Sequence, residues 1–305
     1  MRVAIAQLDQ RAADAASNAR TILEAVAAAR RVGAGLVVTP ELSLCGLPHG
    51  NLPLSHSLVD ACAREIGALA AQIGEEAVIV GLPEREGGAL YDAAAILRDG
   101  RVEAVYRKQS LPGNAIFGAH GFRPGVSPCV FVVAGVRVGV AIGDDLYDTG
   151  PALQARGAGA QVVVVPGGWP YRTRPRADRR TAAEARAREC GVPVAYVNRV
   201  GGEAGLAFDG ASFVLDAKGA LAQQLPAWHE ALAVADFDGD VPRAVRGTLA
   251  DDPEADLLAE LAMRDRRRND LGRLVPERAS GRAPSAAARA RSTDQDTLPP
   301  RDGFV

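Results

Sequence analysis

The sequence predicts an α/β domain that contains mixed parallel and antiparallel sheets. Short apolar runs of strand length alternate with helical stretches over residues 1–240, which is typical of this class. Some strand pairs, such as 93–98 with 102–107, are separated by too few residues for a crossover helix, which indicates hairpins. The expected strands are residues 2–7, 35–39, 77–82, 93–98, 102–107, 130–134, 136–142, 161–166, 192–198, 211–216 and 231–237.

Four helices are expected between these strands. The first is predicted to begin at Ser17 or Asn18, whose side chains can cap a helical N-terminus, and to stop at Gly33. The second carries apolar residues at spacings of three or four, so one of its faces is expected to pack on a sheet. The four ranges are 17–33, 57–73, 151–158 and 176–190.

The α/β pattern fades after Asp240, so residues 1–240 form the predicted domain. Residues 241–272 are expected to form a helical extension, with one helix over 254–268. Residues 273–305 are rich in Ala, Arg, Pro, Ser and Asp and contain few large apolar side chains. This tail is predicted to be disordered, because it cannot bury enough apolar surface to order itself.

Composition argues against several classes of function. The net charge is −2, with 48% hydrophobic and 24% charged residues, so neither a nucleic-acid nor a membrane partner is expected. The apolar runs are strand-sized, and the N-terminus has the pattern of a strand rather than a signal peptide, which favours a cytoplasmic location. The four cysteines lack metal-ligand spacing, so we expect free thiols and neither a metal nor a cofactor.

Polar residues follow several predicted strands, where open α/β sheets usually build their sites. Glu41 follows the strand 35–39 and a proline, and fits a general base or, equally well, a structural cap or ion pair. Lys108 follows the strand 102–107 and is one of only two lysines in a chain that otherwise uses arginine. It can pair with Glu41 or stabilise negative charge, although an exposed strand-end position is the commoner fate of a lysine.

The third segment is Val138-Gly-Val-Ala-Ile-Gly143-Asp144-Asp145-Leu146. A buried strand that breaks at glycine resembles the tight elbow around hydrolase nucleophiles, where backbone N–H groups can point at a ligand. Glycine itself supplies no nucleophile. A metal site from Asp144, Asp145 and Asp148 is a weaker interpretation than capping or turn formation, because no further ligand lies at a suitable spacing.

In order and spacing, these segments resemble the Glu–Lys–Cys elements of the nitrilase (carbon–nitrogen hydrolase) superfamily, and most of all the glutaminase domain of NAD synthetase. The segments that carry the likeness are Pro40-Glu41-Leu-Ser-Leu-Cys-Gly46, Tyr91-Asp-Ala-Ala-Ala95, Tyr106-Arg-Lys108-Gln, Phe122-Arg-Pro-Gly125, Gly191-Val-Pro-Val-Ala-Tyr-Val-Asn198 and Phe208-Asp-Gly-Ala-Ser-Phe-Val-Leu-Asp216. The resemblance covers residues 1–240. It implies a four-layer α-β-β-α sandwich that assembles into a homo-oligomer.

The resemblance also implies roles for individual residues. In active members, a cysteine attacks the amide carbonyl, a glutamate is the general base and a lysine stabilises the tetrahedral intermediate. Glu41 and Lys108 match the glutamate and the lysine, whereas Gly143 falls at the position of the cysteine. Acyl-enzyme chemistry is therefore not expected to start at this position.

The resemblance further implies a set of substrate-binding candidates. They are Leu47, Asn114, Ala119, Asp144, Trp169 and Tyr171. The first three depart from the family pattern, which has a tyrosine, an aromatic residue and a second glutamate there, and the backbone N–H of Asp144 is a candidate anion donor. Trp169 and Tyr171 fall on a loop that lines the pocket in the family, although simple packing explains two aromatic residues equally well.

These matches and departures leave three hypotheses open. The leading one is a hydrolytically silent family member that binds a small amide or amino-acid-like ligand, or acts as a scaffold subunit. The second is an active carbon–nitrogen hydrolase that uses Glu41 and Lys108 on a different small amide, and the third is an interaction protein. The Ser-Gly-Gly-x-Asp-Ser loop of the synthetase half does not occur in the sequence, so a separate amidating or synthetase subunit is a candidate partner.

One basic segment is not explained by any of these hypotheses. Residues 172–180 contain five arginines, at the predicted start of the helix 176–190. Such charge runs usually face solvent, because an arginine is costly to bury without a partner. We therefore expect a solvated loop and helix start in this segment.

Overall fold

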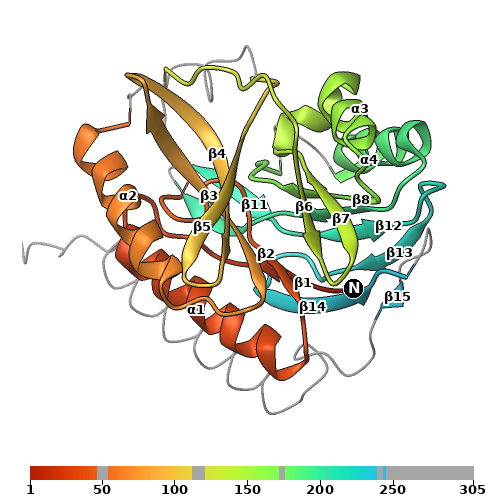
Figure 1. The fold of residues 1–305 in the computed structure, drawn as a ribbon, viewed down its shortest axis with the longest axis horizontal. Coiled ribbons are helices and arrows are strands. Elements are labelled where there is room, and N and C mark those ends of the chain that lie inside the picture. Colours follow the sequence, from red (N-terminus) through yellow and green to blue (C-terminus); the bar gives the residue numbers. More distant parts are fainter. Residues whose placement is uncertain (47–53, 112–120, 172–175, 204, 239–242, 245–305) are drawn as a thin grey trace, which may run out of the picture. The chain divides into compact units, whose positions relative to one another are not determined.

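A computed structural model of the chain describes residues 1–46, 54–111, 121–171, 176–203, 205–238 and 243–244. Two sheets dominate the described part of the chain (Figure 1). Each contains a parallel centre flanked by antiparallel strands, so the predicted α/β class with mixed sheets is confirmed.

The larger sheet has seven strands. In spatial order they are β15 (Arg243–Ala244), β14 (Ala231–Asp236), β1 (Arg2–Gln7), β2 (Leu36–Val38), β3 (Ala77–Glu86), β4 (Ala89–Arg98) and β5 (Arg101–Arg107). Strands β1, β2 and β3 are parallel, and β14 pairs antiparallel to β1 from Arg2↔Asp236 to Gln7↔Ala231. The other end of the sheet is the antiparallel meander β3–β4–β5.

The smaller sheet has six strands. In spatial order they are β13 (Leu221–Gln224), β12 (Phe213–Leu215), β9 (Val194–Val197), β8 (Val162–Pro166), β7 (Val136–Val140) and β6 (Cys129–Val133). Strands β7, β8 and β9 are parallel, whereas the outer pairs are antiparallel. A separate hairpin joins β10 (Val200–Glu203) to β11 (Leu206–Asp209).

Three apolar clusters show how the helices and sheets are layered. Helices α1 (Ala15–Arg31) and α2 (His56–Ala70) bury one face with the larger sheet, and helices α3 (Thr149–Gly157) and α4 (Arg176–Cys190) bury one face with the smaller sheet. The third cluster lies between the two sheets and takes side chains from both, for example Ile5 and Ile79 from one and Val164 from the other. The arrangement is therefore helix–sheet–sheet–helix, as the sequence predicts (Figure 1).

The first helix begins earlier than predicted. Asp14 is its cap, and its side chain accepts a hydrogen bond from the backbone N–H of Ser17 at 3.0 Å, so the predicted caps Ser17 and Asn18 are wrong. Asn18 is buried and instead bonds to the backbone of Arg11 and Leu44, which fixes the loop after β2. The prediction missed β10, β11 and β13, whose residues lack a continuous apolar pattern.

Little of the predicted helical extension lies within the described residues. Arg243 and Ala244 form the short strand β15, which pairs with β14 and continues the larger sheet beyond residue 240. The predicted helix 254–268 and the predicted disordered tail 273–305 lie outside the described residues. Among the helices that the structure describes, none combines the length and apolar character needed to cross a bilayer.

Candidate functional site

Four acidic or basic side chains meet where strands from both sheets end. Glu41 follows β2, Asp92 lies in β4, Lys108 follows β5, and Asp144 lies in the 3-10 turn η2 (Gly143–Tyr147) that follows β7. All four are buried. The fold thus brings the three segments singled out in the sequence together, and adds Asp92, which sequence reasoning missed.

Lys108 is at the centre of this group, which we call the lysine cluster (Glu41, Asp92, Lys108 and Asp144). Its Nζ donates to Oε1 of Glu41 at 2.6 Å and to Oδ2 of Asp144 at 2.9 Å, and lies 3.8 Å from Oδ2 of Asp92. The side chains of Lys108 and Glu41 are each 2% exposed. One ammonium group is therefore shared among three carboxyl groups, out of contact with bulk water.

The surroundings shift two pKa values in this cluster. Burial lowers the pKa of Lys108, but the negative charges of Glu41, Asp144 and Asp92 outweigh it, and the pKa rises well above its usual value. Burial, followed by the charge of Glu41, raises the pKa of Asp92 well above that of a solvated aspartate, while Lys108 opposes the shift. The lysine is therefore held charged, and the neutral form of Asp92 is favoured.

Gly143 stands directly against Glu41. Its φ is +42°, in the left-handed region that favours glycine, and a Cβ added there would lie 2.6 Å from Oε2 of Glu41. The same Cβ would lie 3.2 Å from the carboxyl carbon of Glu41. The carboxyl group of Glu41 therefore occupies the space that a side chain at position 143 would need.

Backbone contacts hold the Glu41 loop in place. The backbone N–H of Glu41 donates to the carbonyl of Gly167, in the loop after β8, at 3.2 Å. On the other side the loop packs on Gly81 of β3, where a Cβ would lie 2.3 Å from the backbone nitrogen of Leu42. Only glycine at position 81 allows the loop to lie this close to β3.

Asp145 connects the lysine segment to the Gly143 turn. It is fully buried and accepts hydrogen bonds from the hydroxyl of Tyr106 at 2.8 Å and from the backbone N–H groups of Ser110 and Ile142 at 2.7 and 2.8 Å. Burial raises the pKa of Asp145, although these hydrogen bonds oppose the shift. The predicted cap or turn role is confirmed for Asp145, and for Asp148, which caps α3.

Trp169 and Tyr171 lie after β8 on the loop whose Gly167 accepts a hydrogen bond from Glu41, and their rings pack in different surroundings. Trp169 is 1% exposed in the core beside α3 and α4, where its ring is 5.0 Å from that of Tyr147 and 5.4 Å from that of Tyr196. Tyr171 is 42% exposed and packs at 5.2 Å, edge to face, against Trp228. The packing interpretation therefore fits Trp169, whereas the ring of Tyr171 contacts Trp228 and also lies beside the guanidinium group of Arg176.

Three of the predicted substrate-binding residues and the question of a metal ion remain for this site. Leu47, Asn114 and Ala119 lie outside the described residues. Across the described part of the chain, no group of three His, Cys, Asp or Glu side chains has the geometry to hold a metal ion. In the sequence Asp92 is a charged residue directly before the apolar run 93–97, but this pattern does not identify its buried partner.

The family is shown by comparison with known proteins. A family model described as carbon-nitrogen hydrolase matches residues 2–246. The chain is 37% identical over 241 residues to the glutamine-dependent NAD(+) synthetase of Xanthomonas campestris pv. campestris (strain 8004), an alignment that covers 78% of this chain and 44% of that relative. The chain thus spans less than half the length of this curated relative.

Solved structures give the same result. The glutamine-dependent NAD+ synthetase of Acinetobacter baumannii matches with a TM-score of 0.75 and 29% identity, over 81% of this chain and 47% of that one. An amidase from Nesterenkonia sp. AN1, of the nitrilase superfamily, matches with a TM-score of 0.69 and 28% identity, over 88% and 96% of the two chains. In that amidase structure the acetamide moiety of fluoroacetamide is covalently attached to the active-site cysteine. By its sequence and its fold, the chain described here belongs to the carbon–nitrogen hydrolase family.

Proposed function

We propose that this chain is a glutaminase-like domain that has lost cysteine-dependent amide hydrolysis and acts as a ligand-binding or scaffold subunit. The observation that carries the proposal is the contact between Gly143 and the carboxyl group of Glu41. In the amidase relative the active-site cysteine is the residue that forms a covalent adduct, with the acetamide moiety of fluoroacetamide. At position 143 of this chain there is no side chain to attack an amide carbonyl, and the space in front of the backbone is filled by Glu41.

The cysteines that the chain does contain are poor substitutes. The thiolate is the attacking form, so a raised pKa makes a cysteine less reactive. A hydrogen bond with Cys62, and then burial, raise the pKa of Cys45, while burial raises the pKa of Cys129 to about 11 and also raises that of Cys190. These three thiols therefore stay protonated near neutral pH.

The arrangement of Glu41 also favours a structural role. A general base must reach the proton that it removes. Here Oε1 of Glu41 accepts from Lys108 at 2.6 Å and Oε2 faces Gly143, so both oxygens are directed at groups that carry no nucleophilic proton. Ligands that such a site would take are small amides or amino-acid-like molecules, as the family implies, and homo-oligomer formation belongs to the same proposal.

A second candidate function is an amide hydrolase that works without a cysteine. It is favoured by the direct contact between Glu41 and Lys108, the two groups that would activate a water and stabilise an anionic intermediate. For either candidate function, the proposed partner is a separate amidating or synthetase subunit. It would act on the ligand that this domain binds or on the product that it releases. This partner is proposed because the alignment covers only 44% of the curated NAD(+) synthetase relative, so more than half of that relative has no counterpart in the alignment.

Ammonia release from glutamine and from a panel of small amides by the purified chain tests the proposal. We expect no release above that of a Glu41→Gln variant. Release by the unaltered chain that the Glu41→Gln substitution abolishes would refute the proposal and favour the second candidate. Loss of a covalent nucleophile costs on the order of 10⁴-fold or more in rate, so the assay has a wide margin.

The variant Gly143→Cys tests whether the pocket still fits the family reaction. A side chain at this position must displace the carboxyl group of Glu41, so we expect little or no restored hydrolysis. Gly143→Ala is the matched control, because it introduces the same Cβ at φ +42° without a thiol. Hydrolysis that appears in the cysteine variant and not in the alanine variant would show that only the sulfur is missing.

A further inference from the structure

At the described start of α4, Arg179 departs from the solvated segment that the sequence predicts, while residues 172–175 lie outside the described residues. The side chain of Arg179 is 1% exposed, whereas those of Arg176 and Arg180 are 43% and 36% exposed. Burial of a guanidinium group is costly unless it is paired. The segment therefore has a structural partner that the sequence pattern did not reveal.

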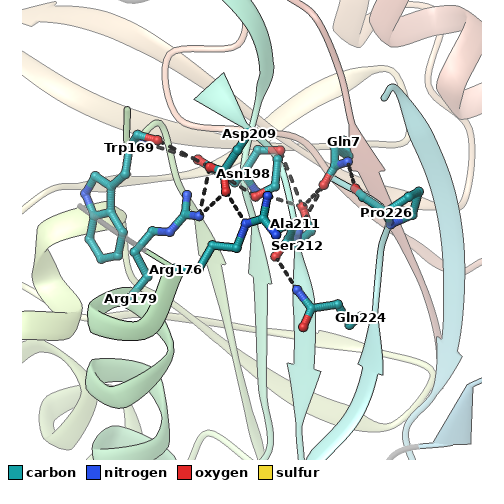
Figure 2. A network of polar contacts seen from close by, with 11 residues as sticks. Gln7, Trp169, Arg176, Arg179, Asn198, Asp209, Ala211, Ser212, Gln224 and Pro226 are labelled. Carbon is teal, nitrogen blue, oxygen red and sulfur yellow. Dashed lines mark hydrogen bonds and ion pairs between the residues drawn. The ribbon is translucent and has the colours of Figure 1, made fainter. Parts of the chain in front are cut away.

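That partner is Asp209, at the end of β11, which is fully buried. Its two oxygens accept from Nη2 of Arg179 at 2.8 Å, and Oδ2 also accepts from Nε of Arg176 at 2.5 Å. Figure 2 shows both arginines converging on this carboxylate. Nε and Nη1 of Arg179 are buried and have no hydrogen-bond partner in the described part of the chain.

A cavity of about 330 Å³ borders this group. Its wall includes Arg176, Arg179 and Arg180 from α4 together with Phe213, Gln224 and Leu225 from the neighbouring strands β12 and β13 and the residue after them. Its three arginines lie in the first turns of α4, and the N-terminus of a helix carries partial positive charge. The cavity thus combines a basic wall with an apolar one.

Among the ion pairs described for this wall, guanidinium groups outnumber carboxylates, although the exposed Asp178 also lies in the first turn of α4. Asp209 is shared by two arginines, and Glu184 accepts from Nε of Arg180 at 2.8 Å while it also pairs with Arg188. Both carboxylates are therefore divided between two guanidinium groups each. Arginine does not lose its proton in proteins, so the surplus must be met by water or by an anion.

Two exposed aromatic rings lie beside Arg176, which is one of the residues that line the cavity. The guanidinium carbon of Arg176 lies 5.9 Å from the ring centre of Tyr171 and 6.0 Å from that of Trp228, and Trp228 is 46% exposed. Trp228 has φ +70°, an unfavourable conformation for a bulky residue, and its N–H donates to the carbonyl of Asp209 at 3.0 Å. The tryptophan is thus held beside the arginines at a conformational cost, which is typical of functional positions.

From these contacts we infer that the cavity is a binding site for a small anion that carries a planar ring. Arg176 and Arg180, both partly exposed, would take the oxyanion, either a carboxylate or a phosphate, in charge-assisted hydrogen bonds. Trp228 and Tyr171 would pack against the ring. None of these residues belongs to the lysine cluster, so the site is separate from the one on which the proposed function rests.

Isothermal titration calorimetry on the full chain tests this inference with four probes. Adenosine monophosphate and benzoate each carry a ring and an anion, inorganic phosphate carries only the anion, and adenosine carries only the ring. We expect one of the first two to bind at least about tenfold more tightly than either single-feature probe, and binding to weaken as salt rises. Preference for the monophosphate or for benzoate identifies the oxyanion as phosphate or carboxylate.

Two substitutions on the same helix locate the site. Arg180→Gln removes a wall residue, and Arg188→Gln is its matched control, because both arginines pair with Glu184 but only Arg180 lines the cavity. We expect the first to weaken binding of the preferred probe by about tenfold and the second to leave it within about twofold. Trp228→Leu should weaken the ring-bearing probe and leave inorganic phosphate unchanged.

The inference fails on any of three results. They are absence of binding by all four probes at millimolar concentration, equal binding of adenosine and its monophosphate, and equal weakening by the Arg180→Gln and Arg188→Gln substitutions. Thermal melts of each variant check that it is folded, so loss of binding is not confused with loss of structure. Ammonia release is not a readout here, so this test and that of the proposed function can fail separately.

Discussion

The chain contains two buried ion clusters of opposite composition. In the lysine cluster, Lys108 contacts Glu41 and Asp144 and lies near Asp92. In the second, which we call the Asp209 cluster, one carboxylate is shared by Arg176 and Arg179 (Figure 2). The first has more carboxyl groups than cations, and the second has more cations than carboxylates.

The two clusters differ in how an excess of buried charge can be compensated. A surplus carboxyl group can be neutralised by binding a proton, and burial raises the pKa of Asp92 in just this direction. A surplus guanidinium group cannot release its proton, so it must face water or an anion. Accordingly the side chains of Lys108 and Glu41 are each 2% exposed, whereas the Asp209 cluster borders a cavity and keeps Arg176 partly exposed.

The largest expected effect is the loss of the central cation. Lys108→Met leaves buried carboxyl groups without their partner, so the free energy of unfolding should fall by about 3–5 kcal/mol, measured by chemical denaturation. Lys218→Met is the control, since Lys218 is exposed in a turn, and it should change the free energy by less than about 0.5 kcal/mol. Similar losses in the two variants would mean that the lysine cluster is not held together by its charge.

A somewhat smaller loss is expected for Asp209→Asn. Arg179 is left buried without a carboxylate, but Arg176 can turn to water, so we expect a loss of about 2–4 kcal/mol in the free energy of unfolding. Phosphate should restore part of this loss, and should restore none of the loss in Lys108→Met, because the described cavity is lined by Arg176 and Arg179 and by no residue of the lysine cluster. If phosphate restored the free energy of unfolding equally in both variants, the expected difference between the Asp209 cluster and the lysine cluster would be contradicted.

The smallest effect concerns pH. Because the folded state raises the pKa of Asp92, the folded chain keeps a proton that the unfolded chain releases, and the resulting stability is lost as pH rises through the folded pKa. Asp92→Asn cannot release a proton, so the free energy of unfolding of this variant should rise relative to that of the unaltered chain as pH increases above the range in which a solvated aspartate titrates. Denaturation at several pH values measures the gain, and the exposed Asp60→Asn serves as control. A constant difference above this range would contradict the sign of the shift.

Much of the fold follows from the alternation of apolar residues. The strands of both parallel centres are continuous apolar runs, such as Val162–Pro166, and these the pattern predicts well. The hairpin β10–β11 was not predicted. Val200–Glu203 contains two glycines, and its strand structure depends on pairing with a neighbouring segment rather than on its own composition. The start of the first helix was misplaced because three residues near it, Asp14, Ser17 and Asn18, can all cap.

The site was predictable in part for a similar reason. Glu41, Lys108 and Gly143 each follow a strand, so the sequence places them at strand ends, and family resemblance groups them. Asp92 and Asp209 depend on which buried partner lies opposite them, and no local pattern contains that information. Trp169 illustrates the same limit, since its position on a loop does not reveal that its ring packs into the core.

The pairing of β1 with β14 has a consequence for synthesis of the chain. The amino group of Met1 donates to the carbonyl of Phe237, and β1 forms a ladder with residues 231–236 along its whole length. While the polypeptide grows on the ribosome, one edge of its first strand stays open until these late residues emerge, and open edges recruit other strands. Nascent chains stalled before residue 231 are therefore the species of this protein that should most need a chaperone.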